Sequence, residues 1–432
     1  MNRIGGHRSE CPRTNPSSGV RRHVQRGVTL LEVVFSIGIV SVGLLGVLII
    51  VPLAGTRSAQ GMIADGGDRT GRNAIRLFDV HHMRQPSMWT RFNTTPQQYQ
   101  EYGVQYVGTD RYTYLWQPNV NTRLQARSFC IDPLFIANQK ALATTNSTNV
   151  SPETQYFPYF QPGTFLPAAM DARMDRVSLR TIPGGATGMT VEQAVSVFMN
   201  DDDVVFSLPT DRTLPPQQKF DASTLKRQSD GKFSWIATLT PVFTNYEEYN
   251  NQPPTSTILP DNYVLSIVVF HRRDLSLTVN TSTSGTEEGA DNERLAIVSQ
   301  FHSQGYGGGD VELQTRPSRP GSDLAVREGE WVMLSAMVDA GSLFKPLISG
   351  HTVSNTQQYV PLFRWYRVMA ADAIAGTGPY TRNVTLQGFD WNEVYALSTA
   401  GRASQTQVTL LNGVVAVYEK TIRLETSSLW TN

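Results

Sequence analysis

The chain has 432 residues, and its apolar and aromatic content (40% and 9%) is that of a globular protein, which excludes a largely disordered chain. The formal net charge is zero and the basic residues cluster only near the amino terminus, so the sequence indicates no nucleic-acid surface. The length allows two or three structural units. Two cysteines, Cys11 and Cys130, exclude a disulfide framework and a cysteine-based zinc site. If Cys11 is removed with a leader, Cys130 stands alone, and such a thiol is typically buried and inert.

Residues 1–27 form a basic amino-terminal segment. The segment holds six arginines and one acid, Glu10, for a net charge of +5, and the rest of the chain, with 31 bases against 36 acids, carries −5. Arg21, Arg22 and Arg26 lie closest to the apolar run that follows. Because basic residues are retained on the cytoplasmic side of a membrane, this distribution predicts a cytoplasmic amino terminus and an extracytoplasmic remainder.

Residues 33–54 form a run of 22 residues without a formal charge. As a helix this run is about 33 Å long, enough to cross the hydrocarbon core of a bilayer. Three interpretations compete. A secretory signal cleaved near Ala54 is disfavoured by the length of the run and by Pro52 in the cleavage region. A plain signal anchor explains the length but gives Glu32, at the edge of the run, no role.

The third interpretation gives Glu32 a function. A carboxylate at this depth costs about 2–3 kcal/mol or more unless a cation pairs with it, so it is a functional candidate by default. Cleavage after Gly27 would create such a cation, the α-amino group of Val28. A neighbouring subunit could bring that amino group into the same layer as the carboxylate.

The stretch RGVTLLEVV (26–34) resembles the class III leader of type IV pilins and type II secretion pseudopilins. That pattern is a basic leader, a glycine, a hydrophobic first residue, Thr-Leu-Leu/Ile-Glu and about twenty apolar residues. Gly27 matches the residue before the cut, Val28 the new amino terminus, and Glu32 the glutamate of the pattern. Val28 replaces the usual phenylalanine, which would affect the efficiency of processing or methylation. The similarity covers residues 21–54.

By this resemblance, a membrane-embedded prepilin peptidase cuts between Gly27 and Val28 and then methylates the Val28 amine. Glu32 of an incoming subunit would pair with the Val28 ammonium of a subunit already in place, and a misaligned subunit would leave a bare charge in hydrocarbon. Residues 28–85 are expected to form one long helix, with a fault at Gly66-Gly67 because each glycine costs roughly 1 kcal/mol. Pro86 should stop this helix.

Residues 86–432 read as a large β-rich, mainly antiparallel head with one or two subdomains, which makes the fold class α+β. A short helix is expected at 190–200, with Thr190 as its cap and Gln193 three residues on. Asn412-Gly413 predicts a hairpin, in which Val415 and Val417, with Tyr418 as a further candidate, pack across the sheet. The clearest strand signals are in the segments 105–118, 233–243, 262–273, 295–301, 331–338, 362–371 and 408–425.

Several other features are weaker functional candidates. The triplet Asp201, Asp202 and Asp203 could bind calcium, but it lacks the spacing of a calcium loop and fits a solvated helix end better. His81 and His82 point to different faces of a helix, which disfavours a metal site. The glycine-rich stretch 305–310 lacks the residues of a phosphate loop and reads as a turn. The aromatic residues that could line a groove, but fit core packing better, are Trp365, Tyr366, Trp391 and Trp430.

The sequence therefore favours a minor pilin-like subunit that is not an enzyme and uses no cofactor or metal. It would be a single-pass protein of the cytoplasmic membrane with an extracytoplasmic head. Its expected partners are the prepilin peptidase, other pilin-like subunits, an inner-membrane assembly platform and the lipid bilayer. Two alternatives stay open: a membrane-anchored binding or enzymatic ectodomain that does not polymerise, and a secreted protein cleaved near Ala54.

Overall fold

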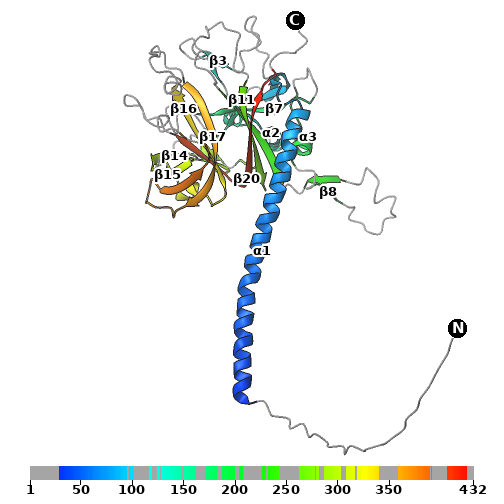
Figure 1. Cartoon of the computed structure of the whole chain (residues 1–432). Coiled ribbons are helices and arrows are strands. Elements are labelled where there is room, and N and C mark those ends of the chain that lie inside the picture. The colour runs from blue at the N-terminus through cyan, green and yellow to red at the C-terminus, as the bar shows by residue number, and fades with distance from the viewer. Residues whose placement is uncertain are drawn as a thin grey trace, which may run out of the picture. The chain divides into compact units, whose positions relative to one another are not determined.

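The computed structural model divides into two compact units, Met1–Gln60 and Gly61–Asn432 (Figure 1). The residues that the structure describes are 29–94, 97–101, 116–118, 124–126, 128–146, 150–160, 172–181, 187–199, 204–207, 226–229, 232–242, 262–277, 279–281, 287–302, 308–316, 319–339, 359–389, 391 and 406–425.

A single helix, α1 (Leu30–Val80), forms the described part of the first unit and the beginning of the second. The helix passes Pro52 without a break and is also continuous through Gly66 and Gly67. The predicted fault at these two glycines is therefore wrong. Beyond Val80 the chain turns and enters a short 3-10 helix, η1 (Pro86–Met88), so the helix ends a few residues before the expected position.

Three glycines of α1 in the second unit, Gly66, Gly67 and Gly71, are contact residues. A Cβ atom at Gly66 would overlap the ring of Phe233, and one at Gly71 would overlap the ring of Tyr418. The helix thus approaches the neighbouring sheet more closely than alanines would allow. Burial of apolar surface along this contact offsets the low helix propensity of glycine, which local propensity alone does not predict.

The first sheet of the head is mixed. Its strand order is β2-β1-β7-β5-β10-β11-β20, with β6 paired to β7 beside this path. Every pair is antiparallel except β5 with β7, which is parallel. The strands are β1 (Trp89–Thr94), β2 (Gln97–Glu101), β5 (Phe129–Ile131), β6 (Tyr156–Phe157), β7 (Met174–Leu179), β10 (Phe233–Pro241), β11 (Asn262–His271) and β20 (Val414–Arg423).

The second sheet closes into a six-stranded antiparallel barrel. Its path is β14-β15-β18-β17-β16-β19, and β19 pairs back onto β14, so the barrel strands leave no open edge. Two further strands, β12 (Val279–Thr281) and β13 (Glu287–Ala290), extend from β14. The barrel strands are β14 (Glu293–Phe301), β15 (Gly308–Gln314), β16 (Trp331–Asp339), β17 (Tyr359–Ala371), β18 (Thr381–Gln387) and β19 (Gln407–Leu411).

The remaining elements are short. Two hairpins, β3–β4 and β8–β9, pair only within themselves among the described strands. They and the small helices are β3 (Trp116–Pro118), β4 (Leu124–Ala126), β8 (Val204–Ser207), β9 (Lys226–Ser229), α2 (Pro133–Asn146), α3 (Val191–Phe198), η2 (Pro152–Gln155) and η4 (Gly321–Leu324).

The mixed sheet is packed on both faces. On one face, Phe78 of α1 and Phe198 of α3 join a core with Trp235 and other strand residues. On the other face, Ile236 packs with barrel residues such as Trp365. The barrel interior holds a separate apolar core. Figure 1 shows β11 and β20 between the barrel strands and the carboxy-terminal half of α1.

Four buried charged side chains join the two sheets. Arg176 on β7 donates to Glu293 on β14, with Nη2 2.6 Å from Oε1 and 2.8 Å from Oε2. Arg273, just after β11, donates two hydrogen bonds to Asp132 at the start of α2, one of 2.8 Å from Nη1 to Oδ1. Burial opposes ionisation of Asp132, but the two arginines outweigh it and lower the pKa of its carboxyl group. The quartet is electrically neutral, which a buried cluster requires.

Of two local predictions, a helix and a hairpin, one is confirmed and the other is wrong. The helix with the Thr190–Gln193 capping box is confirmed as α3. The Asn412-Gly413 hairpin is wrong, because the turn leads from β19 in the barrel to β20 in the mixed sheet, and β20 pairs with β11 instead. Gly413 has a φ of 79°, and a Cβ there would lie 2.6 Å from the His271 carbonyl oxygen. The turn at Asn412-Gly413 is present as predicted, but the strand after it, β20, pairs with β11 and not with β19.

Candidate functional site: the apolar amino-terminal helix

Thr29 begins helix α1. Its carbonyl oxygen accepts hydrogen bonds from the amides of Glu32 and Val33, at 3.0 and 3.2 Å, and its hydroxyl oxygen lies 3.4 Å from the Glu32 amide. A threonine hydroxyl that receives a first-turn amide is an N-cap. The helix therefore starts just after the predicted cleavage position. Gly27 and Val28 themselves lie outside the described residues.

Glu32 stands in the first turn of α1 with its side chain exposed. The sequence Thr-x-x-Glu is the signature of a capping box, in which the glutamate folds back onto the cap residue. Here only the threonine half of that box is present among the described hydrogen bonds: the Glu32 amide points to Thr29, and Ser36 donates to the Glu32 carbonyl oxygen at 2.7 Å. In the described part of the chain, no cation pairs with the Glu32 carboxylate.

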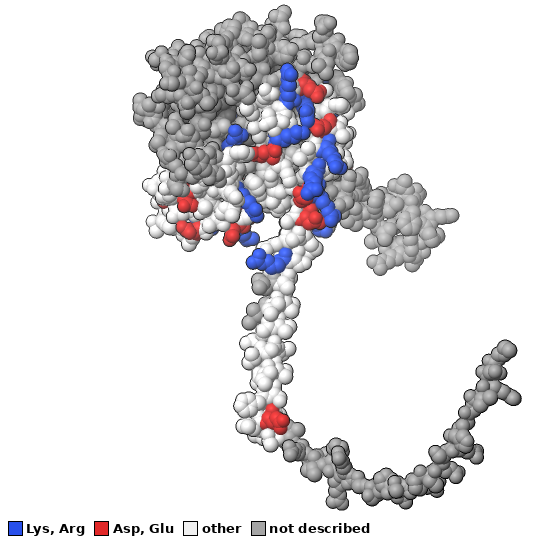
Figure 2. Space-filling model, in the orientation of Figure 1, with Lys and Arg blue, Asp and Glu red and all other residues white. Residues whose placement is uncertain are grey.

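The surface around Glu32 is apolar. The window Leu30–Leu48 has a mean hydropathy of 2.3 and none of it is buried, so this helix is long and apolar enough to cross a membrane. The window overlaps the predicted span 33–54. No charged residue occurs between Glu32 and Arg57, and Figure 2 shows this length of helix without Lys, Arg, Asp or Glu. A carboxylate on such a surface is costly in lipid.

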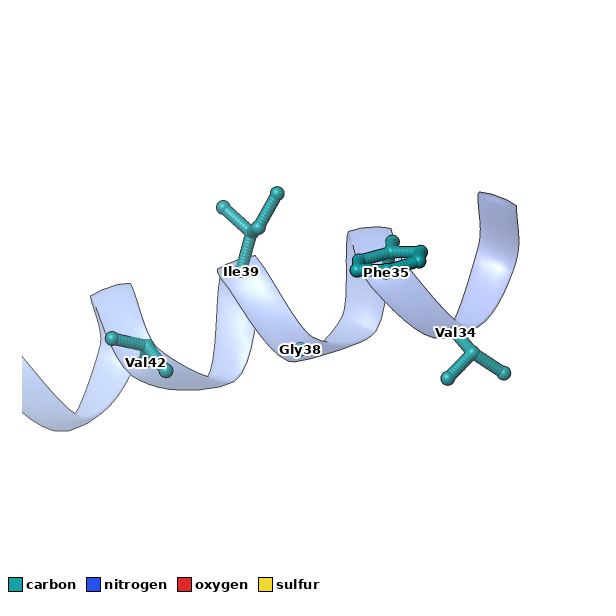
Figure 3. A pocket seen from close by; sticks show the side chains of 5 residues that line it. All are labelled: Val34, Phe35, Gly38, Ile39 and Val42. Atoms are coloured by element: carbon teal, nitrogen blue, oxygen red, sulfur yellow. The ribbon is translucent and has the colours of Figure 1, made fainter. Parts of the chain in front are cut away.

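A shallow apolar hollow lies beside Glu32 on the same helix. It is lined by Val34, Phe35, Gly38, Ile39 and Val42, with Gly38 between the flanking side chains (Figure 3). A Cβ atom at Gly38 would meet nothing within 4 Å, so the hollow faces open space. Small residues of this kind let a second helix approach closely in a membrane.

Among the described residues, the weaker candidates from the sequence form no metal site. His81 and His82 are adjacent in the turn after α1, and burial together with the charge of His82 lowers the pKa of His81. No group of three metal-ligating side chains occurs among the described residues. The aspartates 201–203 and Trp430 lie outside the described residues.

The described part of the glycine-rich stretch and three of the aromatic residues lie in the barrel strands or pack against them. Gly308, Gly309 and Asp310 begin β15, so this part of the predicted turn is a strand. Trp365 and Tyr366 are buried, as core packing predicts. Half-buried Trp391 packs edge-on against Tyr366, with ring centroids 6.4 Å apart.

Cys130 is free and fully buried in the core between the mixed sheet and the barrel, as expected for a lone thiol.

A family model described as the prokaryotic N-terminal methylation motif matches residues 22–48. The chain carries a prepilin-type N-terminal methylation motif. The matched residues include Gly27, Val28, Glu32 and the apolar first part of α1, and a large β-rich region follows the helix, as in a type IV pilin-like protein. The motif implies processing by a prepilin peptidase and assembly with other pilin-like subunits, and with the apolar helix it indicates membrane anchoring. No curated protein and no solved structure matches the chain.

Sequence reasoning missed Thr29 as the cap of α1. The signal was present, because Thr29 and Glu32 have the spacing of a capping box. The close-contact glycines of α1 and the buried quartet between the sheets had no local signal, since each depends on residues far away in the chain.

Proposed function

We propose that this chain is a minor pilin-like structural subunit of a type II secretion or type IV pilus system, without catalytic activity of its own. A prepilin peptidase cleaves it between Gly27 and Val28 and methylates the new amino terminus. The apolar helix holds it in the cytoplasmic membrane, with the leader on the cytoplasmic side and the head outside. An inner-membrane assembly platform and other pilin-like subunits then take it up.

The observation that carries this proposal is the exposed carboxylate of Glu32 at the start of the apolar helix. A charge that lipid surrounds is stable only when a partner neutralises it. The carboxylate also lies one turn from the position at which cleavage would leave a free amine. An amine from a neighbouring copy of this helix is therefore a fitting counterion, and the pairing would set the register between subunits.

The size of the head supports a minor role. The chain after the helix, residues 86–432, is far larger than the helix itself. A tightly packed filament leaves limited room around each subunit, so bulk disfavours a major subunit. Glu32 is present, so the chain can dock beneath another subunit as well as occupy the end of a filament.

The test compares three single substitutions in the native host. Glu32→Ala and the isosteric Glu32→Gln both remove the charge, while Val40→Ala changes an exposed apolar residue of the same helix. We expect both glutamate variants to lose co-isolation with other pilin-like subunits, and Val40→Ala to retain it. Mass spectrometry of the mature chain should find a methylated Val28 at its amino terminus, and Gly27→Ser should leave the leader attached.

Two outcomes would overturn this assignment. Unchanged co-isolation and secretion or piliation in both glutamate variants would favour a membrane-anchored binding or enzymatic ectodomain that does not polymerise. A mature chain that begins at Gly55 would identify a secreted protein.

A further inference from the structure

The apolar hollow on α1 is a gap in a ridge of side chains. Val34, Gly38 and Val42 are spaced four residues apart, so they form one ridge along the helix, and Gly38 interrupts it. Phe35 and Ile39 form the neighbouring ridge, on the other side of the gap (Figure 3). In packed helices, a side chain of the second helix occupies a gap of this kind.

This hollow is fully open in the isolated chain. The four side chains that line it with Gly38 are between 60% and 73% exposed, and a Cβ atom at Gly38 would meet nothing within 4 Å. Because the surrounding helix is apolar enough to cross a membrane, water does not cover this surface there. The hollow is therefore covered either by lipid chains or by another helix.

Glu32 borders the hollow. It precedes Phe35 by three residues and Ile39 by seven, so its side chain lies on the same side of the helix as that ridge. In the described part of the chain, no cation pairs with its carboxylate. Hydrocarbon chains cannot neutralise this charge, whereas a helix that begins with a free amine can. The charge beside the hollow thus favours a protein helix over lipid.

The glycines of the apolar window agree with this choice. At 3.6 residues per turn, all three glycines of Leu30–Leu48 lie in the same half of the helix as Glu32. These glycines are Gly38, Gly43 and Gly46. The other half carries the large side chains of Val33, Ile37, Val40 and Leu44. Since small residues allow close approach between membrane helices, the glycine-bearing half is the one suited to a second helix.

We propose that the hollow docks the processed amino-terminal helix of another pilin-like subunit, one side chain of which fills the gap at Gly38. The two helices run in parallel, because both processed ends start on the cytoplasmic side. The large head disfavours a run of adjacent copies, so the partner is a different chain. This inference rests on the proposed function and adds the face and the register of the contact.

The charge pair sets that register. If the Glu32 carboxylate binds the amine of the partner's first residue, the partner lies out of step by four residues, about one turn or 5.4 Å. Each residue of this helix then faces a partner residue that is one turn closer to the partner's own amino terminus. The side chain in the gap at Gly38 therefore belongs to about the seventh residue of the partner's mature chain.

Photo-cross-linking in the native host tests this contact with the full chain. p-Benzoylphenylalanine replaces Leu45, which lies seven residues after Gly38, on the same side of the helix and beyond the hollow. Leu44 is the matched control position, because both leucines are 61% exposed but Leu44 faces the other half. The probe at 45 should link to another pilin-like subunit, and the probe at 44 to lipid. Mass spectrometry should place the protein link near about the fourteenth residue of the partner's mature chain.

Two further variants test the gap itself in the background of the probe at 45. Gly38→Leu fills the hollow, and Val40→Phe adds the same number of carbon atoms on the other half of the helix. Gly38→Leu should abolish the protein link, while Val40→Phe should preserve it. Both positions face open space, so each variant should match the parent chain in abundance and in removal of the leader.

The outcomes separate this inference from the proposed function. If Glu32→Gln abolishes co-isolation but the probes at 44 and 45 link equally, or Gly38→Leu leaves the link intact, the proposed function stands and the docking face is wrong. A protein link without the one-turn displacement, or a link to a second copy of this chain, would overturn the register or the choice of partner. If both probes link only to lipid and the glutamate variants keep co-isolation, both proposals fail.

Discussion

Arg176 of the mixed sheet and Glu293 of the barrel form a fully enclosed ion pair, with both side chains at most 4% exposed and Nη2 2.6 Å from Oε1. The same carboxylate accepts the backbone amide of Tyr159 at 2.7 Å, and the Arg176 guanidinium lies 3.9 Å from the ring centroid of Phe135. Because the pair joins strands from two sheets, it fixes how the barrel meets the mixed sheet. Because the pair is buried, replacing one partner should cost more stability than replacing both partners together.

Removing one partner of this pair should destabilise the head strongly. Arg176→Met or Glu293→Leu alone leaves an uncompensated buried charge and should lower the free energy of unfolding by about 3–5 kcal/mol. The double variant should be closer to the parent, since neither charge remains. Urea denaturation of the full chain in detergent, followed by tryptophan fluorescence, measures all four members of the cycle. As the control, Asp65→Asn breaks the exposed pair with Arg69 and should cost about 0–1 kcal/mol. Strict additivity of the two single effects would refute this account.

Alanine substitutions at two glycines of α1 should have opposite effects on stability, because one glycine is in close contact with a side chain and the other is not. Gly71→Ala places a methyl group against the ring of Tyr418, which a 3.0 Å hydrogen bond to Asp68 holds in place. We expect a loss of about 1–3 kcal/mol from overpacking. Gly61→Ala, on the same helix with nothing within 4 Å, should be neutral or stabilise by up to about 1 kcal/mol through helix propensity. Thermal unfolding of both variants checks the contrast, and similar losses at the two positions would mean that the close contact is not decisive.

Tyr418 should make the anchoring of α1 sensitive to alkali. Burial, the hydrogen bond to Asp68 and the charge of that carboxylate raise the pKa of Tyr418 to about 12, against an ordinary value of 10.0. Folding therefore favours the protonated phenol. This contribution is fully present below pH 10 and is lost as the pH rises from about 10 to about 12. Tyr418→Phe should remove that part of the alkaline dependence while leaving the dependence due to Tyr99, whose pKa is also raised to about 12. Ultraviolet titration of the phenolate, compared between parent and variant, gives the difference directly.

Cys130 should report the opening of the core between the two sheets. Burial is the main cause that raises the pKa of its thiol well above the ordinary value, so the reactive thiolate is scarce as well as enclosed. With the proposed cleavage after Gly27, Cys11 would be removed and Cys130 would be the one cysteine of the mature sequence. A maleimide should label the folded mature chain very slowly and the urea-unfolded chain completely. Arg176→Met should accelerate labelling under native conditions. Rapid labelling of the folded parent chain would contradict the described burial.

Local chemistry explains which elements were predictable. The capping box at Thr190 and Gln193 lies within one turn of helix, so its four residues were enough to place α3. The turn at Asn412-Gly413 was equally local, but the partner of the following strand was not. β20 pairs with β11, whose residues lie about 150 positions earlier, and the choice between β19 and β11 depends on which edge the tertiary packing leaves open.

The amino-terminal site was determined by the sequence itself. Its features are a basic leader, a glycine before a hydrophobic residue, a glutamate and an uninterrupted apolar run. Each is a property of consecutive residues that interact with solvent or lipid, so it does not depend on the rest of the chain. The tertiary structure alone decided the closed barrel and the neutral quartet around Arg176. These depend on side chains brought together from distant positions, and contacts of that kind form only when burial of apolar surface and pairing of buried charges are satisfied together.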